Sequence, residues 1–444
     1  MKNLIKHLYC VGLIMAFLLS SFGFSTNLIL ECSYLDISEA PTCFQFSDGS
    51  ELFLQAGQHA QVIGYDGCLV KPLGGGGLFV PFTKKASRKI TITLRRLEPC
   101  KVEYCTLAAL PLIRKSLYDE LASQIGNTGL SLYEESNGNR IWLKHECDNL
   151  FESHYDRVYL ALFRIYEEQG LIKPGCKVLE TTSGSAGISF AGIGRKLGYD
   201  CYVALPAGGE KAREVALKNV GATIIFTDRD KYISAFPEFV KDFLHNHKDY
   251  FFLNHSMGKK GSQNEVSLAA LEGIIAEVKS KLRIDFFLPA VGNGSSVLGP
   301  GRVLDSWSKL VAFESVQSAV MYELMYPGQY QDIYGIKPGT LSRHRLPGTS
   351  FNGITFPHIV NAVGSGIVNR VVLVSDEKMD QEYFLLTGKT YTEHLPHWDK
   401  YFPADFIFGR STRCGIAVAR ELAKSVKDKN FLVIAYDKAN RYDS

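Results

Sequence analysis

Residues 177–205 read KVLETTSGSAGISFAGIGRKLGYDCYVAL, and this stretch decides the fold class. Residues 177–180 and 201–205 are short enough and apolar enough to predict strands, and residues 187–196 have the pattern of a helix. A turn of small residues, 181–186, joins the first strand to the helix. Strands that alternate with helices in this way form a parallel sheet covered by helices. The sequence therefore predicts an α/β fold.

A second glycine-rich turn strengthens this prediction and suggests a ligand site. The apolar stretch 286–291 predicts a strand, and Gly292-Asn293-Gly294-Ser295-Ser296 follows it directly. Ligands of open α/β sheets bind at such strand-to-helix junctions, where backbone N–H groups can face an anion. These five residues are candidate anion-binding residues, and the alternative is an ordinary glycine turn.

The first 25 residues have the pattern of a secretory signal. Lys2 and Lys6 precede an apolar run from Leu8 to Phe24, and small residues follow at a spacing suited to cleavage. An exported protein, periplasmic or secreted, is therefore expected. The alternative is an uncleaved membrane anchor, since a run of this length is at the short limit for spanning a bilayer.

Residues 26–110 predict a small β-rich domain in front of the α/β domain, which is expected to occupy residues 111–444. Alternating stretches such as 51–54 and 89–94 indicate strands. Five cysteines fall in this region, and an oxidising compartment would permit disulfides, although an odd number leaves at least one unpaired within it. They are Cys32, Cys43, Cys68, Cys100 and Cys105.

Composition and charge exclude several classes of protein. Of 444 residues, 46% are hydrophobic and 21% are charged, which is typical of a globular protein. The formal net charge of +3 gives no electrostatic reason to expect nucleic-acid binding. The cysteine spacings do not suit a zinc site, and no metal is predicted.

The segment Asn149-Leu150-Phe151-Glu152-Ser153-His154-Tyr155-Asp156-Arg157 carries a resemblance to a known family. It is similar to the loop Asn-Pro-x-x-Ser-x-Lys-Asp-Arg of cysteine synthases, fold-type II pyridoxal-phosphate enzymes that are also related to the tryptophan synthase β chain. Further landmarks follow in the family's order from about residue 124 to the last residue. They include residues 125–130, 180–187, 220–225, 290–296 and 436–444.

The resemblance implies two interleaved α/β subdomains with parallel sheets, and pyridoxal 5′-phosphate as the cofactor. It also implies that Tyr155 occupies the position of the lysine that holds the cofactor. A phenol cannot form an imine, so the cofactor would be bound non-covalently or lost. Tyr155 and its neighbour His154 are the candidate catalytic residues, because either could move a proton. A packed structural histidine is the alternative for His154.

Other site residues follow from the same resemblance. Thr182, Ser183, Ser185 and Ala186 correspond to the loop that holds the substrate carboxylate, with Ser185 in place of an asparagine that also contacts the cofactor. The turn 292–296 corresponds to the phosphate loop. The segment Ser411-Thr412-Arg413-Cys414-Gly415 corresponds to the turn that faces the pyridine nitrogen, with Arg413 and Cys414 as candidate contacts.

A lysine elsewhere in the chain could replace the missing amine. Lys144, Lys211, Lys259 and Lys260 lie in segments expected near the cleft. Each is more simply interpreted as a solvated surface residue.

Two functions remain open. The first is an exported pyridoxal-phosphate enzyme that carries out β-replacement or β-elimination on a small amino acid. The second is a non-catalytic relative that binds a phosphate-bearing or amino-acid-like ligand, or a protein partner through the N-terminal β domain. The resemblance also implies a homodimer.

Overall fold

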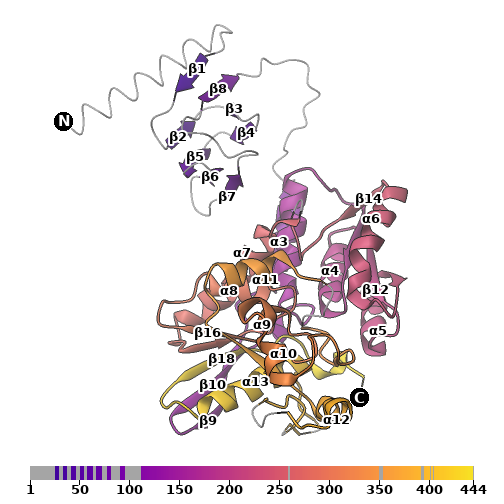
Figure 1. Ribbon diagram of the computed structural model, residues 1–444. Helices are drawn as coiled ribbons and strands as arrows, with labels where there is room; N and C mark the ends of the chain where they lie inside the picture. Colours follow the sequence, from indigo (N-terminus) through magenta and orange to yellow (C-terminus); the bar gives the residue numbers. More distant parts are fainter. Residues whose placement is uncertain are drawn as a thin grey trace, which may run out of the picture. The chain divides into compact units, whose positions relative to one another are not determined.

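The computed structural model divides the chain into two compact units, residues 1–106 and residues 107–444, which are described separately (Figure 1). Before residue 112, it describes only the backbone of strands between residues 26 and 95. After that point it describes residues 112–443 except 259–260, 350–353, 392–394, 401 and 404. The predicted signal, residues 1–25, and the side chains of the five N-terminal cysteines lie outside the described residues.

The described strands of the first unit form two antiparallel sheets of four strands each. One sheet has the order β1-β8-β3-β4 and the other the order β2-β5-β6-β7. Their bounds are β1 Thr26–Ile29, β2 Tyr34–Ile37, β3 Thr42–Phe46, β4 Glu51–Leu54, β5 Gln58–Ile63, β6 Gly67–Pro72, β7 Leu78–Pro81 and β8 Thr91–Arg95. The region is therefore rich in β-structure, as its alternating pattern indicates.

The second unit contains a four-stranded sheet in which every neighbouring pair is parallel, with the order β13-β12-β11-β14. Its strands are β11 Lys177–Thr181, β12 Asp200–Pro206, β13 Thr223–Thr227 and β14 Tyr250–Phe252. The helices between them are α4 Ser185–Lys196, α5 Lys211–Asn219 and α6 Phe236–Asn246, with the short 3₁₀ helix η2 Tyr232–Ala235 before α6. The alternation predicted from residues 177–205 is therefore confirmed.

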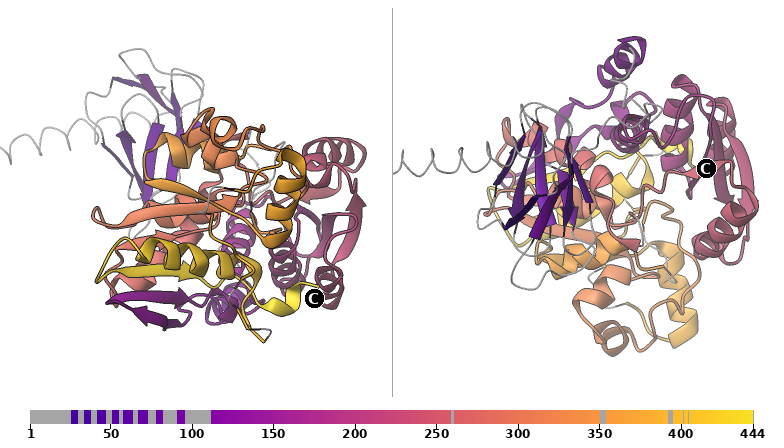
Figure 2. Two further views of the ribbon diagram at one scale, coloured as in Figure 1. Left: turned by 60° about the horizontal axis from the view of Figure 1, so that its bottom comes forward. Right: turned by 90° about the horizontal axis from the view of Figure 1, so that it is seen from above.

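A six-stranded sheet forms the larger part of this unit, with the order β17-β16-β15-β18-β10-β9. All its pairs are parallel except β9 with β10. Its strands are β9 Leu130–Ser136, β10 Asn139–Lys144, β15 Phe286–Leu288, β16 Lys309–Ser315, β17 Arg370–Val374 and β18 Asn430–Ile434. In Figures 1 and 2 the two sheets lie on opposite sides of the unit.

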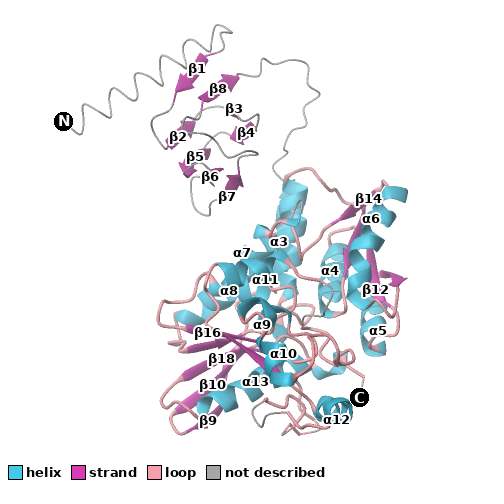
Figure 3. Cartoon of the chain, in the orientation of Figure 1, coloured by secondary structure: helices cyan, strands magenta, loops and turns pink. Residues whose placement is uncertain are grey.

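Helices flank both sheets (Figure 3). The remaining helices are α2 Leu112–Ala122, α3 Tyr155–Glu168, α7 Glu265–Lys279, α8 Ser295–Gly301, α9 Val320–Met325, α10 Gln329–Tyr334, α11 Pro357–Gly364, α12 Glu377–Thr387 and α13 Arg410–Ala423, with 3₁₀ turns η1 Glu146–Asp148 and η4 Ala439–Arg441. Helix α3 packs against both α4 and α7, so it connects the parts of the unit built around the two sheets. Within the described ranges, no helix is both long enough and apolar enough to cross a bilayer.

The core is continuous through this unit because central strands of parallel sheets are buried on both faces. Val178 of β11, Phe287 of β15 and Val433 of β18 are all fully buried. Small residues allow α4 to approach closely: a Cβ placed on Gly192 would lie 2.3 Å from the Phe151 ring. This packing fixes the segment before α3 against α4.

Candidate functional site

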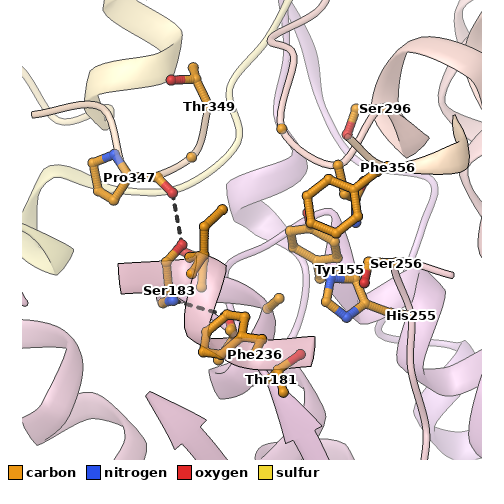
Figure 4. A pocket seen from close by; sticks show the side chains of 18 of the residues that line it. Tyr155, Thr181, Ser183, Phe236, His255, Ser256, Ser296, Pro347, Thr349 and Phe356 are labelled. Atoms are coloured by element: carbon orange, nitrogen blue, oxygen red, sulfur yellow. Dashed lines mark hydrogen bonds between the residues drawn. The ribbon is translucent and has the colours of Figure 1, made fainter. Parts of the chain in front are cut away.

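A cavity of about 400 Å³ lies where the turns that follow several strands meet. One part of its wall comes from the turn after β11, from residues 290–296 after β15, from the start of α3 and from residues 436–442 after β18. Another part comes from helices α5, α6 and α13, from the segment after β14 and from residues 347–349, 354 and 356. Ligand sites of α/β proteins form at this edge of their sheets. Figure 4 shows Tyr155, His255 and Ser256 along one wall, with Ser183 and Pro347 across the cavity.

Tyr155 lies at the first residue of α3 and lines the cavity. The helix begins here because the Ser153 hydroxyl accepts a hydrogen bond from the Tyr155 N–H at 3.2 Å, satisfying one of the free amides of the first turn. Burial, together with the nearby Glu180 carboxylate, raises the pKa of the Tyr155 phenol above its ordinary value. Tyr155 is therefore a neutral phenol at physiological pH.

His154 is buried beside Tyr155, with ring centroids 4.1 Å apart. Its Nε2 lies 3.1 Å from the Ser296 hydroxyl, and its Nδ1 has no hydrogen-bond partner within the described part of the chain. Burial lowers the pKa of His154 to about 3. The neutral ring can still hydrogen-bond, but it is a poor proton acceptor at neutral pH.

The lowered pKa of His154 predicts a specific loss of stability in acid. The unfolded chain binds this proton below pH 6.5 and the folded chain only near pH 3, so stability falls as the pH falls between these values. We expect the wild-type protein to lose about 2 kcal/mol more free energy of unfolding than His154→Gln between pH ~7.5 and pH ~5. Urea titrations at both pH values measure this difference.

The matched control is His245→Gln, because His245 is exposed to solvent. This variant should keep the full acid dependence of the wild type. His358, whose pKa burial also lowers, to about 4, is present in all three proteins, so its contribution cancels. An identical acid dependence in the wild type and His154→Gln would show that His154 is not held neutral.

The predicted carboxylate loop lines the cavity with all four of its residues, Thr182, Ser183, Ser185 and Ala186. Its hydroxyl groups are already engaged within the protein. Ser183 Oγ donates to the Pro347 carbonyl at 2.8 Å (Figure 4), and Ser185 Oγ donates to Asp437 Oδ2 at 2.7 Å. The loop is therefore held in shape by contacts with distant segments of the chain.

The predicted phosphate turn contributes three of its five residues, Gly292, Asn293 and Ser296, to the cavity wall. Gly294 faces α11 instead: its φ is +89°, and a Cβ there would lie 2.6 Å from the Ile359 nitrogen. Ser295 is fully buried, and its N–H donates to Asn293 Oδ1 at 2.9 Å. Gly294 and Ser295 thus shape the turn without reaching the cavity.

Arg413 and Cys414, the predicted contacts of the pyridine nitrogen, do not line the cavity. The Arg413 guanidinium lies over the Phe406 ring, 5.4 Å from its centroid, and Cys414 is buried in the core. Ser411, in the first turn of the same helix, lines the cavity instead. Successive helix residues point about 100° apart, so the three side chains cannot share one direction.

The structure also corrects the surface placement of Lys144. This side chain is 1% exposed, and its Nζ donates to Glu277 Oε2 at 2.6 Å and to the Thr128 carbonyl at 2.7 Å. It belongs to a buried ion-pair network and does not line the cavity. Lys211 is exposed and pairs with Glu214, whereas Lys259 and Lys260 lie outside the described residues.

The residues of the cavity wall that sequence reasoning missed include Lys241, His255 and Arg213. Of the described residues that line the cavity, Lys241 is the only lysine, and it is exposed to solvent. No local pattern marks these residues, because α5, α6 and the turn after β14 reach the cavity only through the sheet topology. Only the order of the strands could have indicated them.

Arg213 is buried beneath the carboxylate loop. Its Nη1 donates to the Ser183 carbonyl at 3.0 Å, and its guanidinium stacks on Tyr442 at 4.6 Å from the ring centroid. Gly184 makes room for it, since a Cβ there would lie 2.2 Å from Arg213 Nη1. Asp437, which also lines the cavity, offsets this cation: its Oδ2 lies 3.9 Å from Arg213 Nη2.

One group of side chains within the described residues has metal-ligand chemistry: His145, Cys147 and Asp148, with one ligand atom of each within 4.8 Å of the others. None of the three lines the cavity. Cys147 is buried, which together with the nearby Asp148 carboxylate raises the pKa of its thiol to about 12.

Comparison with known proteins agrees with this architecture. The family model described as pyridoxal-phosphate dependent enzyme matches residues 121–383, more than half of the chain. A cysteine synthase from Aquifex aeolicus is 27% identical over 305 residues, which are 68% of this chain and 82% of that protein. A putative mitochondrial cysteine synthase from Saccharomyces cerevisiae is 26% identical over 336 residues, 72% of this chain and 81% of that protein.

Solved structures show the same fold. A hydrogen sulfide-producing enzyme from Fusobacterium nucleatum superposes with a TM-score of 0.57 at 21% identity, covering 73% of this chain and 99% of that one. A cysteine synthase from Entamoeba histolytica gives 0.54 at 22% identity, with 78% and 91% covered. The resemblance inferred from the sequence and the predicted fold class are both confirmed.

Proposed function

Because the chain belongs to the pyridoxal-phosphate dependent enzyme family, we propose that it binds a phosphate-bearing, amino-acid-like ligand in the cavity without a covalent link to it. One observation carries this proposal. The sequence resemblance matches Tyr155 to the family's lysine, and the phenol of Tyr155 lines the cavity beside the glycine turn and the carboxylate loop. A phenol can position a ligand, but it cannot hold an aldehyde covalently.

The glycine turn and Ser411 are compatible with the family's cofactor, pyridoxal 5′-phosphate, whereas its attachment and the contact made by the replaced asparagine, now Ser185, are not retained. Asn293 lines the cavity and its Nδ2 is buried without a partner within the described residues, so the turn retains an unused hydrogen-bond donor that a phosphate could accept. Gly292, Asn293 and Ser296 would hold the phosphate, and Ser411 the ring nitrogen. When bound to an enzyme, the cofactor supplies an electron sink for reactions at an amino acid α-carbon.

A second candidate function is a pyridoxal-phosphate enzyme that performs β-replacement or β-elimination with a displaced lysine. One observation favours it: Lys241 of α6 lies at the cavity wall and is exposed, so its amine is accessible. The two candidates differ in a measurable way, because only the second requires a lysine that reacts with the cofactor.

The test titrates the full-length chain with pyridoxal 5′-phosphate in an amine-free buffer by calorimetry. The same samples are then reduced with borohydride, and the labelled peptides are mapped by mass spectrometry. We expect saturable binding with no specifically labelled peptide. Ser296→Leu, which replaces a hydroxyl on the wall by a branched apolar side chain, should weaken binding at least about tenfold through lost hydrogen bonding and steric conflict.

Each other outcome rejects the proposal in a different way. A label on Lys241 that disappears in Lys241→Arg would favour the displaced-lysine enzyme. Absence of binding, with the protein folded by circular dichroism, would mean that the fold serves another purpose. Glu238→Gln, a change at an exposed residue of the same helix, is the control that should bind like the wild type.

Export remains part of this proposal and is supported by the pattern of residues 1–25 alone. We propose that the mature chain begins near residue 26, carries the β unit outside the cytoplasm and forms a homodimer, with the β unit available to a protein partner. N-terminal sequencing of the protein from fractionated cells tests cleavage and export, and a cytoplasmic protein that retains residues 1–25 would reject export. Light scattering of the mature chain tests whether it is a homodimer.

A further inference from the structure

Glu180, at the end of β11, places a fully buried carboxylate just behind the cavity wall. It accepts hydrogen bonds from the Thr181 N–H at 2.8 Å and from the His255 N–H at 3.1 Å, and His255 Nδ1 lies 3.2 Å from it. Within the described residues, no lysine or arginine forms an ion pair with it. Buried carboxylates are normally paired with a cation, and within the described residues the one ion-pair partner of Glu180 is His255, which is charged only when protonated.

His255 stands between this carboxylate and the cavity. Because a carboxylate has only lone pairs to offer, the proton of a neutral His255 lies on Nδ1 facing Glu180, which leaves Nε2 as an acceptor. Tyr159 Oη, 2.9 Å from the same Nδ1, closes the buried side of the ring. His255 itself lines the cavity and meets the Tyr155 ring edge-on at 5.2 Å between centroids.

The other titratable side chains near His255 carry no positive charge that could offset the Glu180 carboxylate. His154 and His358 are held neutral by burial, which lowers the pKa of each. The Tyr155 and Tyr159 phenols stay protonated, because burial raises both pKa values and the Glu180 carboxylate raises them further. With a neutral His255, this end of the cavity offers the His255 Nε2 lone pair and the Tyr155 hydroxyl, with the Glu180 carboxylate behind them.

Resting on the proposed function, we propose that the ligand carries its own primary amine, which binds against Tyr155 and His255 where other members of the family supply a lysine. The ligand class is a phosphate monoester with a primary ammonium group. The ammonium group donates hydrogen bonds to the Tyr155 hydroxyl and to His255 Nε2, and its positive charge offsets the negative charge of Glu180 on the other side of the His255 ring. The cavity, about 400 Å³, has the size of a small-molecule site.

The experiment compares three probes that share a ring and a phosphate and differ only at the carbon that carries the aldehyde. They are pyridoxamine 5′-phosphate with an amine, pyridoxal 5′-phosphate with an aldehyde, and 4-deoxypyridoxine 5′-phosphate with a methyl group. Calorimetry on the full-length chain in an amine-free buffer gives the three dissociation constants. We expect the amine form to bind at least about tenfold tighter than the methyl form, the effect of one charged hydrogen bond.

Glu180→Gln should remove this preference, bringing the amine and methyl forms to within about twofold, because the negative charge behind His255 is gone. His255→Phe, which keeps a ring but has no lone pair, should act in the same way and serves as a second variant if Glu180→Gln does not fold. The matched control is Glu168→Gln, at an exposed carboxylate on α3, which should keep the wild-type preference.

The outcomes separate this inference from the function on which it rests. Equal affinities for the three probes would overturn the amine site but leave non-covalent phosphate-ligand binding intact. A preference that survives in Glu180→Gln and His255→Phe would also overturn it, because the amine would then lie elsewhere. If none of the three probes binds to the folded protein, the proposed function and this inference are both rejected.

Discussion

Tyr155→Lys is expected to convert a cavity that holds pyridoxal 5′-phosphate non-covalently into one that carries it on a lysine. The substituted amine would stand at the first turn of α3, on the wall between His154 and His255. Tyr155 has no side-chain hydrogen bond within the described residues, so its replacement breaks no polar contact. Burial beside His154 and Tyr159 would also favour the neutral, nucleophilic form of the new amine.

The measurement is borohydride reduction followed by peptide mapping. We expect a stoichiometric label on the peptide that contains position 155 in the variant and none there in the wild type. If the carboxylate loop and Ser411 are competent, the variant should also release pyruvate or ammonia from a serine ester by β-elimination. Capture without elimination would mean that the altered loop, with Ser185 and Ala186, no longer orients the substrate.

Two controls make this result specific. Tyr155→Met has a side chain of similar length without an amine and should gain no label. Lys241→Arg in the Tyr155→Lys background should leave the label in place, because the new lysine is the reactive one. A Tyr155→Lys protein that binds the cofactor but never traps it would show that position 155 does not face the aldehyde carbon.

Glu146→Gln is expected to destabilise the α/β unit by about 3 kcal/mol or more, the cost of breaking a buried ion pair on one side. Glu146 is fully buried and accepts from Arg157 Nε at 2.7 Å and Nη2 at 2.8 Å. In the variant, Arg157 and Lys144 share one remaining carboxylate, that of Glu277. Hydrogen bonds from both cations lower the pKa of Glu277 to about 2, although burial alone would raise it.

Urea unfolding followed by tryptophan fluorescence measures this effect. All three tryptophans, Trp142, Trp307 and Trp398, lie in the α/β unit, so the signal reports on that unit alone. The control is Glu135→Gln, which removes an ion pair at the surface. The side chains of this pair, Glu135 and Arg140, are 47% and 43% exposed, so the variant should lower the free energy of unfolding by at most about 1 kcal/mol. Equal losses in the two variants would contradict the role of the buried network.

The fold was predictable because its signals are local. Strand and helix limits near residue 177 follow from the pattern of apolar residues, and the structure shifts them by one or two positions. Helix α3 begins at Tyr155, where the Ser153 hydroxyl satisfies its first amide. The strand expected to reach Val291 ends as β15 at Leu288, since Pro289 has no N–H to continue the ladder.

The cavity was predictable only where a resemblance supplied residues one by one. The resemblance named Tyr155, His154, the carboxylate loop and the glycine turn, and all of these except Gly294 and Ser295 line the same cavity. It missed the Glu180–His255 pair, because the two residues lie 75 positions apart and meet only when β11 pairs with β14. The prediction that Lys144 lies at the surface was wrong for the same reason, because the carboxylate that pairs with it in the core, Glu277, is 133 positions away in the sequence.

The order of the six-stranded sheet has a consequence for biosynthesis. β18, the last of its strands along the chain, lies between β10 and β15 and pairs with both. The sheet therefore cannot be completed while residues 430–434 are still inside the ribosome. Almost 290 further residues must be synthesised after β10 before its parallel neighbour β18 is available to pair with it. Such non-local pairing is slow and leaves strand edges open to aggregation. Until then a nascent chain exposes the apolar edges of β10 and β15, and chaperones are expected to bind it there.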